Sequence, residues 1–415
     1  MKNIGLVGFG ISNKALCDYF LKQGDRVYVH NETSVPLPNG AIPVFSRDYL
    51  SCNEDIVFRS PGVHPKKIKT KAPILVESDF ALSKINIPKL LVTGSDGKTT
   101  TSTLIHKMLG DGSFIGGNIG TPLLNAVNMP CKYLVGELSS FQLLNSSPKC
   151  NVAVITNITE NHLDWHESMD EYVEAKLNLL KNATRVVLPY DDPLLYKEGL
   201  KHKNATFFSL GDLSGESFDR VYIKDGFVYH NDRRLFGACE IALPGSYNLL
   251  NILASIGATY EFASAEHQAL VAKTFKGVAG RLEFIKKVGG VSFFNSSIDT
   301  TPSRTLATAS ALDISKTVLI MGGYDKSLSY DILKEPLKNA RGVVLFGGNK
   351  YKILKNLACH TIVVDNLKEA LAASLSLAKE GDNILLSPAS ASFDMFSSYK
   401  DRGDQFTKLV QELKE

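Results

Sequence analysis

The chain has 415 residues, 44% hydrophobic and 21% charged, and its 46 basic and 43 acidic side chains leave a net charge of +3. This balance disfavours a nucleic-acid-binding protein, and the length suits about two to four globular domains. No apolar run is long enough to span a bilayer, and the first residues form a strand pattern rather than a signal peptide. Six cysteines without a Cys-x-x-Cys pair are typical of reduced thiols, so we expect a cytoplasmic protein without a membrane or nucleic-acid partner.

The first segment, about 1–87, predicts a Rossmann-like domain. A strand at Ile4–Val7 leads into Gly8 and Gly10, which fit the first two glycines of a dinucleotide-binding turn, but Asn13 stands at the third position. The turn leaves three alternatives open: a phosphate-bearing nucleotide, NAD, or a purely structural role. Two further strands of a parallel sheet are expected at Arg26–His30 and Asp55–Arg59.

The second segment, about 88–277, opens with the most informative stretch of the chain. An apolar strand from Lys89 ends in the loop Gly94-Ser95-Asp96-Gly97-Lys98-Thr99, and a helix-compatible run, Thr103–Leu109, follows. Such loops bind phosphates through backbone N–H groups and the positive end of the helix, with the lysine on the β- and γ-phosphates and the threonine on Mg²⁺. Val92 replaces the first glycine of the full P-loop spacing, and a plain glycine turn is the alternative.

Polar residues follow two further strands of this segment. Glu137 comes directly after the strand Tyr133–Gly136, and His162 follows the strand Val152–Thr156, which we place two strands from the phosphate loop. Carboxylate oxygens are the ligands that Mg²⁺ prefers, and a single histidine is tolerated less often. By itself, His162 is more typical of a capping residue, and Lys176 of a solvent-exposed helix lysine. One more strand is expected at Arg185–Leu188.

The third segment, about 278–415, repeats the alternation of strands and helices. A helix is expected at Leu367–Ala378, and the strands at Val291–Asn295, Thr317–Met321, Gly342–Phe346, Thr361–Val364 and Asn383–Leu386. This pattern predicts a second Rossmann-like sheet. The whole chain is therefore expected to be an α/β protein of three domains, with a central P-loop ATPase-like parallel sheet between two Rossmann-like domains.

Several motifs, in order along the chain, resemble those of the Mur ligases, and in particular of the UDP-N-acetylmuramoyl-L-alanine:D-glutamate ligases. They are Thr93–Thr100, Gly116–Gly120, Glu137–Leu143, Asn157–Asp164, Leu386–Asp394 and Tyr399–Gly403. The resemblance runs nearly end to end and implies ATP-dependent addition of D-glutamate to UDP-MurNAc-L-Ala through an acyl phosphate, in peptidoglycan precursor synthesis. It also implies two Mg²⁺ ions, a carbamylated lysine, small-molecule partners only, and a monomer.

The resemblance implies a role for each residue that matches a family position. The ATP-binding residues would be Gly94, Ser95, Asp96, Gly97, Lys98, Thr99, Thr100, Asn248, Asn251 and Arg281. The metal ligands would be Thr99, Glu137, His162 and Lys176 as its carbamate. The UDP-substrate would contact Ile11, Ser12, Asn31, Glu32, Thr33, Ser60 and Asn118, and D-glutamate would contact Thr300, Lys326, Ser392 and Tyr399. Lys98, Glu137, His162, Lys176 and Lys326 would carry catalysis.

The start of the third segment departs from the family pattern. The family often reads Asn-Asp-Ser-Lys-x-Thr there, but Ser296 and Ile298 replace the acidic residue expected near the ribose and the lysine expected near the reacting phosphate. Asp299 or Lys326 are candidates to compensate. These two contacts cannot be carried over from the family.

Other functions remain open at the level of the sequence. A folylpolyglutamate-type or another Mur-type ligase would share the central loop, although the motifs at 137–143 and 387–394 and the glycine turn of the first segment argue against it. A P-loop NTPase or binding protein would make no amide. An NAD-dependent oxidoreductase would need the third glycine that Asn13 replaces, although Glu32 could mimic the acidic ribose contact. Release of ADP that requires both UDP-MurNAc-L-Ala and D-glutamate would separate these classes.

Overall fold

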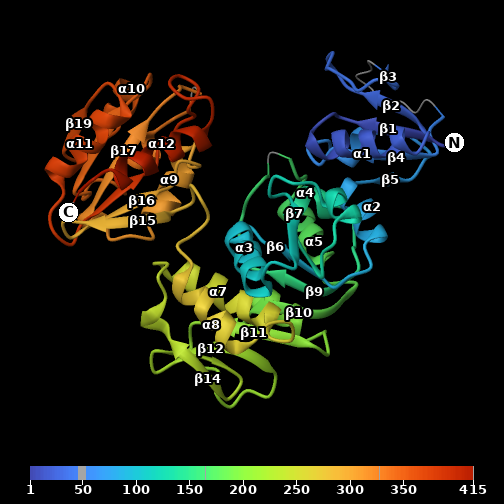
Figure 1. Cartoon of the computed structure of the whole chain (residues 1–415), viewed down its shortest axis with the longest axis horizontal. Coiled ribbons are helices and arrows are strands. Elements are labelled where there is room, and N and C mark those ends of the chain that lie inside the picture. Colours follow the sequence, from blue (N-terminus) through green and yellow to red (C-terminus); the bar gives the residue numbers. More distant parts are fainter. Residues whose placement is uncertain (45–52, 164, 327, 415) are drawn as a thin grey trace. The chain divides into compact units, whose positions relative to one another are not determined.

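The computed structural model describes residues 1–44, 53–163, 165–326 and 328–414 (Figure 1). Asp164, the last residue of one motif above, lies outside these ranges. The chain is an α/β protein with three sheets, and each sheet takes its strands from one of the three expected segments. It forms two compact units, Met1–Glu240 with Leu250–Ala272, and Ile241–Leu249 with Lys273–Glu415. The domain boundaries near 87 and 277 remain predictions.

The first sheet is parallel throughout and has the Rossmann-like strand order β3-β2-β1-β4-β5. The expected strands at 4–7, 26–30 and 55–59 are confirmed, while β3 and β5 were not predicted. The elements of this sheet are β1 (Asn3–Val7), α1 (Ile11–Lys22), β2 (Arg26–His30), β3 (Ala41–Val44), β4 (Ile56–Arg59) and β5 (Ile74–Leu75). Because β1 is central, the turn that leaves it lies at the sheet's carboxyl edge between the ends of β2 and β4.

Asn13, which stands at the position of the third glycine, stabilises this turn through hydrogen bonds. Its buried amide nitrogen donates to the carbonyl oxygens of Val7 at 3.1 Å, Gly8 at 2.7 Å and Phe58 at 3.3 Å. One side chain therefore ties the start of α1 to both β1 and β4. Gly8 is still required, because its φ is +76° and an added Cβ would lie 2.9 Å from the Cβ of Ser60.

The central sheet has nine strands in the order β14-β13-β12-β11-β10-β9-β6-β8-β7. Seven of them run parallel, and an antiparallel hairpin that the sequence reading missed closes one edge. The strands are β6 (Lys89–Thr93), β7 (Ser113–Gly117), β8 (Tyr133–Glu137), β9 (Cys150–Ile155), β10 (Ala183–Pro189), β11 (Ala205–Ser209), β12 (Asp219–Lys224), β13 (Phe227–His230) and β14 (Arg233–Gly237). The helices are α2 (Glu77–Lys84), α3 (Lys98–Leu109), α4 (Ser140–Leu143), α5 (Met169–Leu177), α6 (Pro193–Gly199), α7 (Ser246–Thr259) and α8 (Ala265–Thr274).

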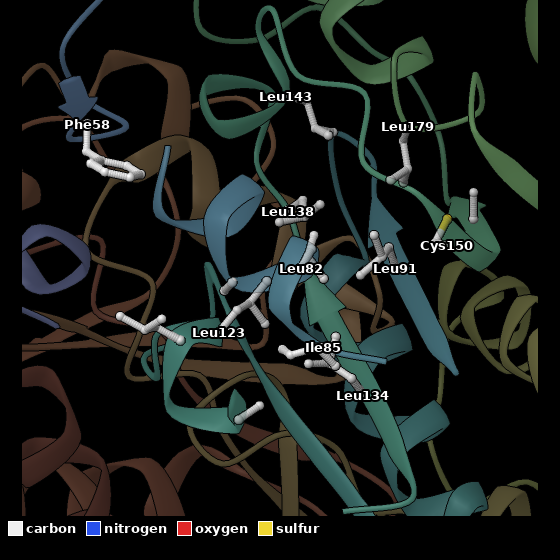
Figure 2. Close-up of a cluster of buried hydrophobic side chains, with 14 of the residues drawn as sticks. Phe58, Leu82, Ile85, Leu91, Leu123, Leu134, Leu138, Leu143, Cys150 and Leu179 are labelled. Atoms are coloured by element: carbon white, nitrogen blue, oxygen red, sulfur yellow. The ribbon is translucent and has the colours of Figure 1, made fainter. Parts of the chain in front are cut away.

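A continuous apolar core joins the first two sheets within the first unit. Phe58 from β4, Leu82 from α2, Leu91 from β6 and Leu123 are all buried in one cluster, which Figure 2 shows in close-up. Each such leucine or phenylalanine contributes roughly 1.5–3 kcal/mol of transfer free energy on burial. Among the described residues, no helix is both long and apolar enough to cross a membrane.

The third sheet has six strands in the order β15-β16-β20-β17-β18-β19, with β15 antiparallel at one edge. The five strands expected from the sequence are confirmed close to their predicted bounds. The elements are β15 (Glu283–Val288), β16 (Val291–Asn295), α9 (Pro302–Ala309), β17 (Thr317–Gly322), β18 (Gly342–Phe346), α10 (Lys350–Leu354), β19 (Thr361–Val363), α11 (Leu367–Leu377), β20 (Asn383–Leu386) and α12 (Tyr399–Gln411).

A buried arginine of α12 holds the loops at the carboxyl edge of this sheet. The Nε of Arg402 donates to Ser297 Oγ at 2.9 Å, and its Nη atoms donate to the carbonyl oxygens of Ser297 at 2.9 Å and of Ser390 and Ala391 at 3.1 Å. Burial lowers the pKa of Arg402 to about 10, against the opposing effect of Asp394, so the guanidinium stays charged at neutral pH. The loops after β16 and β20 are thereby fixed to each other.

We predict that Arg402→Met destabilises the second unit by about 2–5 kcal/mol, because buried carbonyl groups lose their charged donor. Hydrogen exchange of peptides from β16 and β20 should accelerate strongly. Fluorescence of Trp165, the only tryptophan of the chain, reports on the first unit and should show an unchanged unfolding midpoint. Unaltered exchange in β16 and β20 would contradict this role, and Arg402→Lys should recover only part of the protection.

Candidate active site

The phosphate loop lies between β6 and α3, and its two glycines are required by both conformation and space. Gly94 has φ of +149° and Gly97 φ of +79°, which side-chain-bearing residues rarely adopt. An added Cβ would lie 1.9 Å from Thr156 Oγ1 at Gly94 and 2.3 Å from Asn251 Oδ1 at Gly97. The loop backbone therefore packs directly against β9's end and α7.

The first turn of α3 presents positive charge to this loop. The helix begins at Lys98, earlier than the expected segment, and has no acidic residue in its first turn. Its free N–H groups and dipole therefore favour an anion there. Lys98 Nζ donates to the carbonyl oxygens of Gly94 and Ser95, both at 2.8 Å, which keeps the ammonium over the loop.

Glu137 lies beside the start of α3. It is the last residue of β8, rather than the first residue after it, and β8 pairs directly with β6. Its buried carboxylate accepts from Thr99 Oγ1 at 2.8 Å and from Asn118 Nδ2 at 2.9 Å, one donor on each oxygen. Each carboxylate oxygen can accept more than one bond, so the group retains lone pairs for a hard cation.

The loop after β9 packs against the phosphate loop from the other side. β9 pairs with β6 as its immediate neighbour, so the expectation of a two-strand separation was wrong. Asn157 Oδ1 accepts from the N–H of Asp96 at 2.9 Å, and its carbonyl oxygen accepts from the N–H of Ser95 at 2.9 Å. Neighbours in a parallel sheet need not be neighbours in sequence, which is why spacing alone misplaced this strand.

His162 lies at the end of this loop with an exposed side chain and a left-handed φ of +56°. Its ring meets that of Phe141 edge-on, with centroids 5.0 Å apart. A positive φ is uncommon for histidine, and functional sites are enriched in such strained residues. Its role as a metal ligand remains a prediction.

Lys176 on α5 is buried, so the interpretation as a solvent-exposed lysine was wrong. Only 2% of the residue is exposed, and its Nζ donates to the carbonyl oxygen of Gly94 at 2.7 Å. Burial, and then the nearby charge of Lys98, lower the pKa of Lys176 to about 6, with Asp96 opposing. At pH 7 the side chain is therefore mostly a neutral amine, which is a nucleophile.

Tyr172, one helical turn before Lys176, is a site residue that sequence reasoning missed. Ser95 Oγ donates to the carbonyl oxygen of Thr159 at 2.9 Å, so it accepts the hydroxyl of Tyr172 at 2.7 Å and the N–H of Thr159 at 2.9 Å. The Tyr172 ring also covers Lys176 Nζ, 4.5 Å from the ring centroid. The i, i+4 spacing of the two residues on one helix was the available signal.

The candidate residues for the UDP-substrate gather at the carboxyl edge of the first sheet. Ile11 and Ser12 begin α1, Asn31 and its neighbours follow β2, and Ser60 follows β4. Ile11 is 65% exposed, so its side chain is accessible at this edge. Asn118 is separate from this group and lies on the central sheet beside Glu137.

The candidate residues for D-glutamate gather at the carboxyl edge of the third sheet. The N–H of Tyr324 donates to Ala391 at 2.9 Å, which brings the loop of Lys326 beside that of Ser392. Ser297 Oγ donates to the carbonyl oxygen of Tyr399 at 2.8 Å, which brings the Thr300 loop to the start of α12. Lys326 and Tyr399 are exposed, Thr300 is half-buried, and Ser392 is buried.

The remaining ATP candidates have separate surroundings. Asn251 is buried and accepts from Thr101 Oγ1 at 3.2 Å, close to the phosphate loop, whereas Asn248 donates to Pro244 at 2.6 Å. Arg281 is exposed. Asp299 is buried and accepts from Ser387 Oγ at 2.8 Å, and burial raises its pKa. The role of Asp299 as a substitute for the missing ribose contact remains a prediction.

Two family models match the chain. The Mur ligase middle domain matches residues 92–259, and the Mur ligase, glutamate ligase domain matches residues 280–390. Among solved structures, the UDP-N-acetylmuramate-alanine ligase MurC of Thermotoga maritima is similar over 100% of both chains, with a TM-score of 0.58 and 20% identity. The MurF ligase of Thermotoga maritima in complex with ADP covers 99% of this chain and 95% of its own, with a TM-score of 0.57 and 20% identity. These structures establish a shared three-domain fold.

Curated relatives match over nearly the full length. The UDP-N-acetylmuramoylalanine--D-glutamate ligase of Clostridium kluyveri is 37% identical over 453 aligned residues, covering 99% of this chain and 97% of that protein. The corresponding ligases of Clostridium tetani and Ruminiclostridium cellulolyticum are each 34% identical, with 97% of each protein covered. The chain therefore belongs to the UDP-N-acetylmuramoylalanine--D-glutamate ligase family of the Mur ligases.

Proposed function

We propose that this chain is an ATP-dependent ligase that joins D-glutamate to UDP-N-acetylmuramoyl-L-alanine in cytoplasmic peptidoglycan precursor synthesis. The observation that carries the proposal is the group around Glu137, where Thr99 and Asn118 place their donors on one buried carboxylate beside the phosphate loop. Such a group suits a nucleotide phosphate on one side and a substrate on the other. The full-length relatives named above support the choice of D-glutamate as the amino acid.

The residues present fit ATP and Mg²⁺. Gly94 and Gly97 allow the tight turn that leads into α3, and the first turn of this helix supplies free N–H groups that suit phosphate oxygens. Glu137 and Thr99 offer the hard oxygen ligands that Mg²⁺ requires, and we assign His162 to the same metal site. When bound, Mg²⁺ would neutralise charge on the transferring phosphoryl group.

The chemistry follows from what the chain's residues hold in place. The alanyl carboxylate attacks the γ-phosphorus of ATP, ADP leaves, and the amine of D-glutamate then displaces phosphate from the acyl phosphate to form the amide. Lys98, at the start of α3, is placed to stabilise charge on the β- and γ-phosphates. Lys326 lies on the loop after β17, where its ammonium can bind a carboxylate of D-glutamate.

We assign a carbamate to Lys176. Its neutral amine can attack the carbon of CO₂, and loss of a proton then leaves an N-carboxylate with two anionic oxygens. The N-carboxylate would supply anionic oxygens, the type of ligand that Mg²⁺ prefers, where the unmodified side chain offers only an amine nitrogen. The remaining N–H of the carbamate can keep donating to the carbonyl oxygen of Gly94, which would hold the new group beside the phosphate loop.

Substrate dependence is the direct test of this function. We expect ADP release to require both UDP-N-acetylmuramoyl-L-alanine and D-glutamate, measured against a panel of L- and D-amino acids. Release of ADP without the amino acid would favour an NTPase, and equal use of another amino acid would favour a different ligase.

Lys98→Ala and Glu137→Ala should each lower the rate of ADP formation by at least about 10²–10³-fold, because each removes a preorganised contact to the transferring phosphoryl group. Circular dichroism should confirm that both variants fold. Lys107→Ala, at the far end of α3, is the matched control and should retain activity. Near-normal turnover of a folded Lys98 or Glu137 variant would contradict the assignment of the phosphate site.

Activation of bicarbonate-depleted enzyme should depend on pH through Lys176. Because the pKa of Lys176 is about 6, its amine is protonated and unreactive below that pH and free to form the carbamate above it. Activity restored by bicarbonate should therefore rise between about pH 5 and 7 and then level off. Lys176→Ala should be nearly inactive and partly rescued by acetate or propionate, whereas Lys181→Ala should behave as wild type. An active enzyme without a carbamate carbon signal after ¹³C-bicarbonate labelling would disprove the assignment.

Lys326→Ala and Ser392→Ala should raise the KM for D-glutamate by about 10–150-fold, since each removes a contact to a charged carboxylate. The KM for ATP should change little, because Lys326 and Ser392 belong to the second unit and the phosphate loop to the first. Lys379→Ala, an exposed lysine of the same unit, is the control. Equal increases in KM for all three substrates would indicate a structural role instead.

A further inference from the structure

Four ionisable side chains form a second cluster outside the candidate active site. His64 follows β4, His166 and Glu167 lie just before α5, and Glu171 lies in the first turn of α5, all within the same unit. One ligand atom from each of His64, Glu167 and Glu171 lies within 4.8 Å of the others. We refer to these four residues as the His64 cluster.

The spacing of the donors in the His64 cluster matches that of a bound ion. His64 Nε2 lies 3.6 Å from Glu171 Oε2, and His166 Nδ1 lies 3.2 Å from the same oxygen. A tetrahedral zinc ion with bonds of about 2.0–2.1 Å holds its ligand atoms roughly 3.3 Å apart. His64 Nε2 and Glu171 Oε2, which come from two separate segments, are thus already close to ligand spacing.

A buried histidine nitrogen in the cluster has no hydrogen-bond partner. The His64 side chain is only 9% exposed, yet its Nε2 makes no hydrogen bond, although it faces Glu171. Buried polar atoms without a partner are rare and costly in native structures. A cation bound between His64 and the two glutamates would satisfy this nitrogen.

We propose that the His64 cluster binds a divalent transition-metal ion of the Zn²⁺ type. Its three mutually close ligands, one imidazole and two carboxylates, are a set that zinc accepts, whereas Mg²⁺ prefers oxygen ligands alone. His166 is fully buried, and it is hydrogen-bonded to Ser140 Oγ at 2.9 Å and to Glu171 Oε2 at 3.2 Å. Such an outer hydrogen bond orients a metal-ligating carboxylate.

Two contacts of the His64 cluster, both involving Lys66, must be given up when a metal ion binds. His64 Nδ1 accepts a long hydrogen bond from the Lys66 N–H at 3.3 Å, so the neutral ring carries its proton on Nε2. Metal binding moves that proton to Nδ1 and gives up this contact. The ammonium of Lys66 contacts Glu167 Oε2, and the N–H of Glu167 donates to Glu171 Oε2 at 3.0 Å. Lys66 therefore competes with the metal for Glu167, and acid should weaken binding.

The bound ion would join the turn after β4 to the start of α5. Trp165 Nε1 already donates to the carbonyl oxygen of Gly62 at 2.9 Å across the same junction, and its ring lies 4.8 Å from that of His64. Because α5 also carries Tyr172 and Lys176, the ion would stabilise the helix that supports the phosphate loop. The proposal is independent of the reaction assigned above.

Zinc titration of the full chain tests the proposal, with Glu137→Gln/His162→Gln as background so that the candidate active-site metal position is removed. We expect one Zn²⁺ per chain by calorimetry, together with a change in Trp165 fluorescence. Adding His64→Gln or Glu171→Gln to this background should weaken Zn²⁺ binding by about tenfold or more. Loss of an outer-shell hydrogen bond already lowers metal affinity by about 10–100-fold, and loss of a direct ligand should cost at least as much. His202→Gln, a histidine outside the cluster, should leave Zn²⁺ affinity unchanged.

Crystals of the wild-type chain soaked in Zn²⁺ give a readout that does not depend on how the variants fold. An anomalous peak bonded to His64 Nε2 and Glu171 at the zinc edge would establish the site. Zinc found only elsewhere, or a Zn²⁺ affinity of a folded His64→Gln protein within twofold of its background, would overturn the proposal.

Discussion

Buried basic side chains that donate to main-chain carbonyl oxygens hold the functional loops of this protein in place. Lys176 binds the Gly94 carbonyl, Arg402 binds the loops after β16 and β20, and Arg59 Nη2 donates to Phe141 at 2.6 Å and Leu144 at 3.1 Å. Carbonyl dipoles partly replace the water that a buried cation loses, without requiring a buried acid. Burial lowers the pKa of Arg59 and Arg402 only to about 10, so they remain charged, whereas that of Lys176 falls to about 6. The same environment therefore makes the arginines structural and the lysine reactive.

Adjacent parallel strands give the phosphate loop its neighbours. β8 and β9 flank β6, so their carboxyl ends deliver Glu137 and Asn157 to opposite sides of one glycine-bounded turn. The hydroxyl of Ser95 also joins the loop to its neighbours, because it bonds to the carbonyl oxygen of Thr159 and to the hydroxyl of Tyr172. The site is thus assembled by the order of strands in the sheet, and each polar side chain needs to reach only a short distance.

The sequence was sufficient for the apolar strands at the centre of each sheet and for the phosphate loop, because apolar runs and glycine turns are local signals. The roles of the candidate residues remain predictions. It was insufficient for the position of β9 beside β6 and for the burial of Lys176, since both depend on contacts between distant segments. The hairpin β13–β14 was missed because its strands are short, and one of them, Arg233–Gly237, carries charged residues instead of an apolar run. Tyr172 was missed because a tyrosine at helical spacing is ordinarily a core residue.

That same hairpin determines how the nine-stranded sheet ends. A long sheet with a bare outer strand can recruit a strand from another molecule, and β14 occupies that outer position. Its exposed residues Arg233 and Arg234 are both charged; Arg233 pairs with Glu266 at 3.1 Å, and the Arg234 guanidinium lies 3.3 Å from the centre of the Phe227 ring. Charged side chains on an outer strand discourage its pairing with another chain. The hairpin therefore disfavours edge-to-edge aggregation at that side of the enzyme's largest sheet.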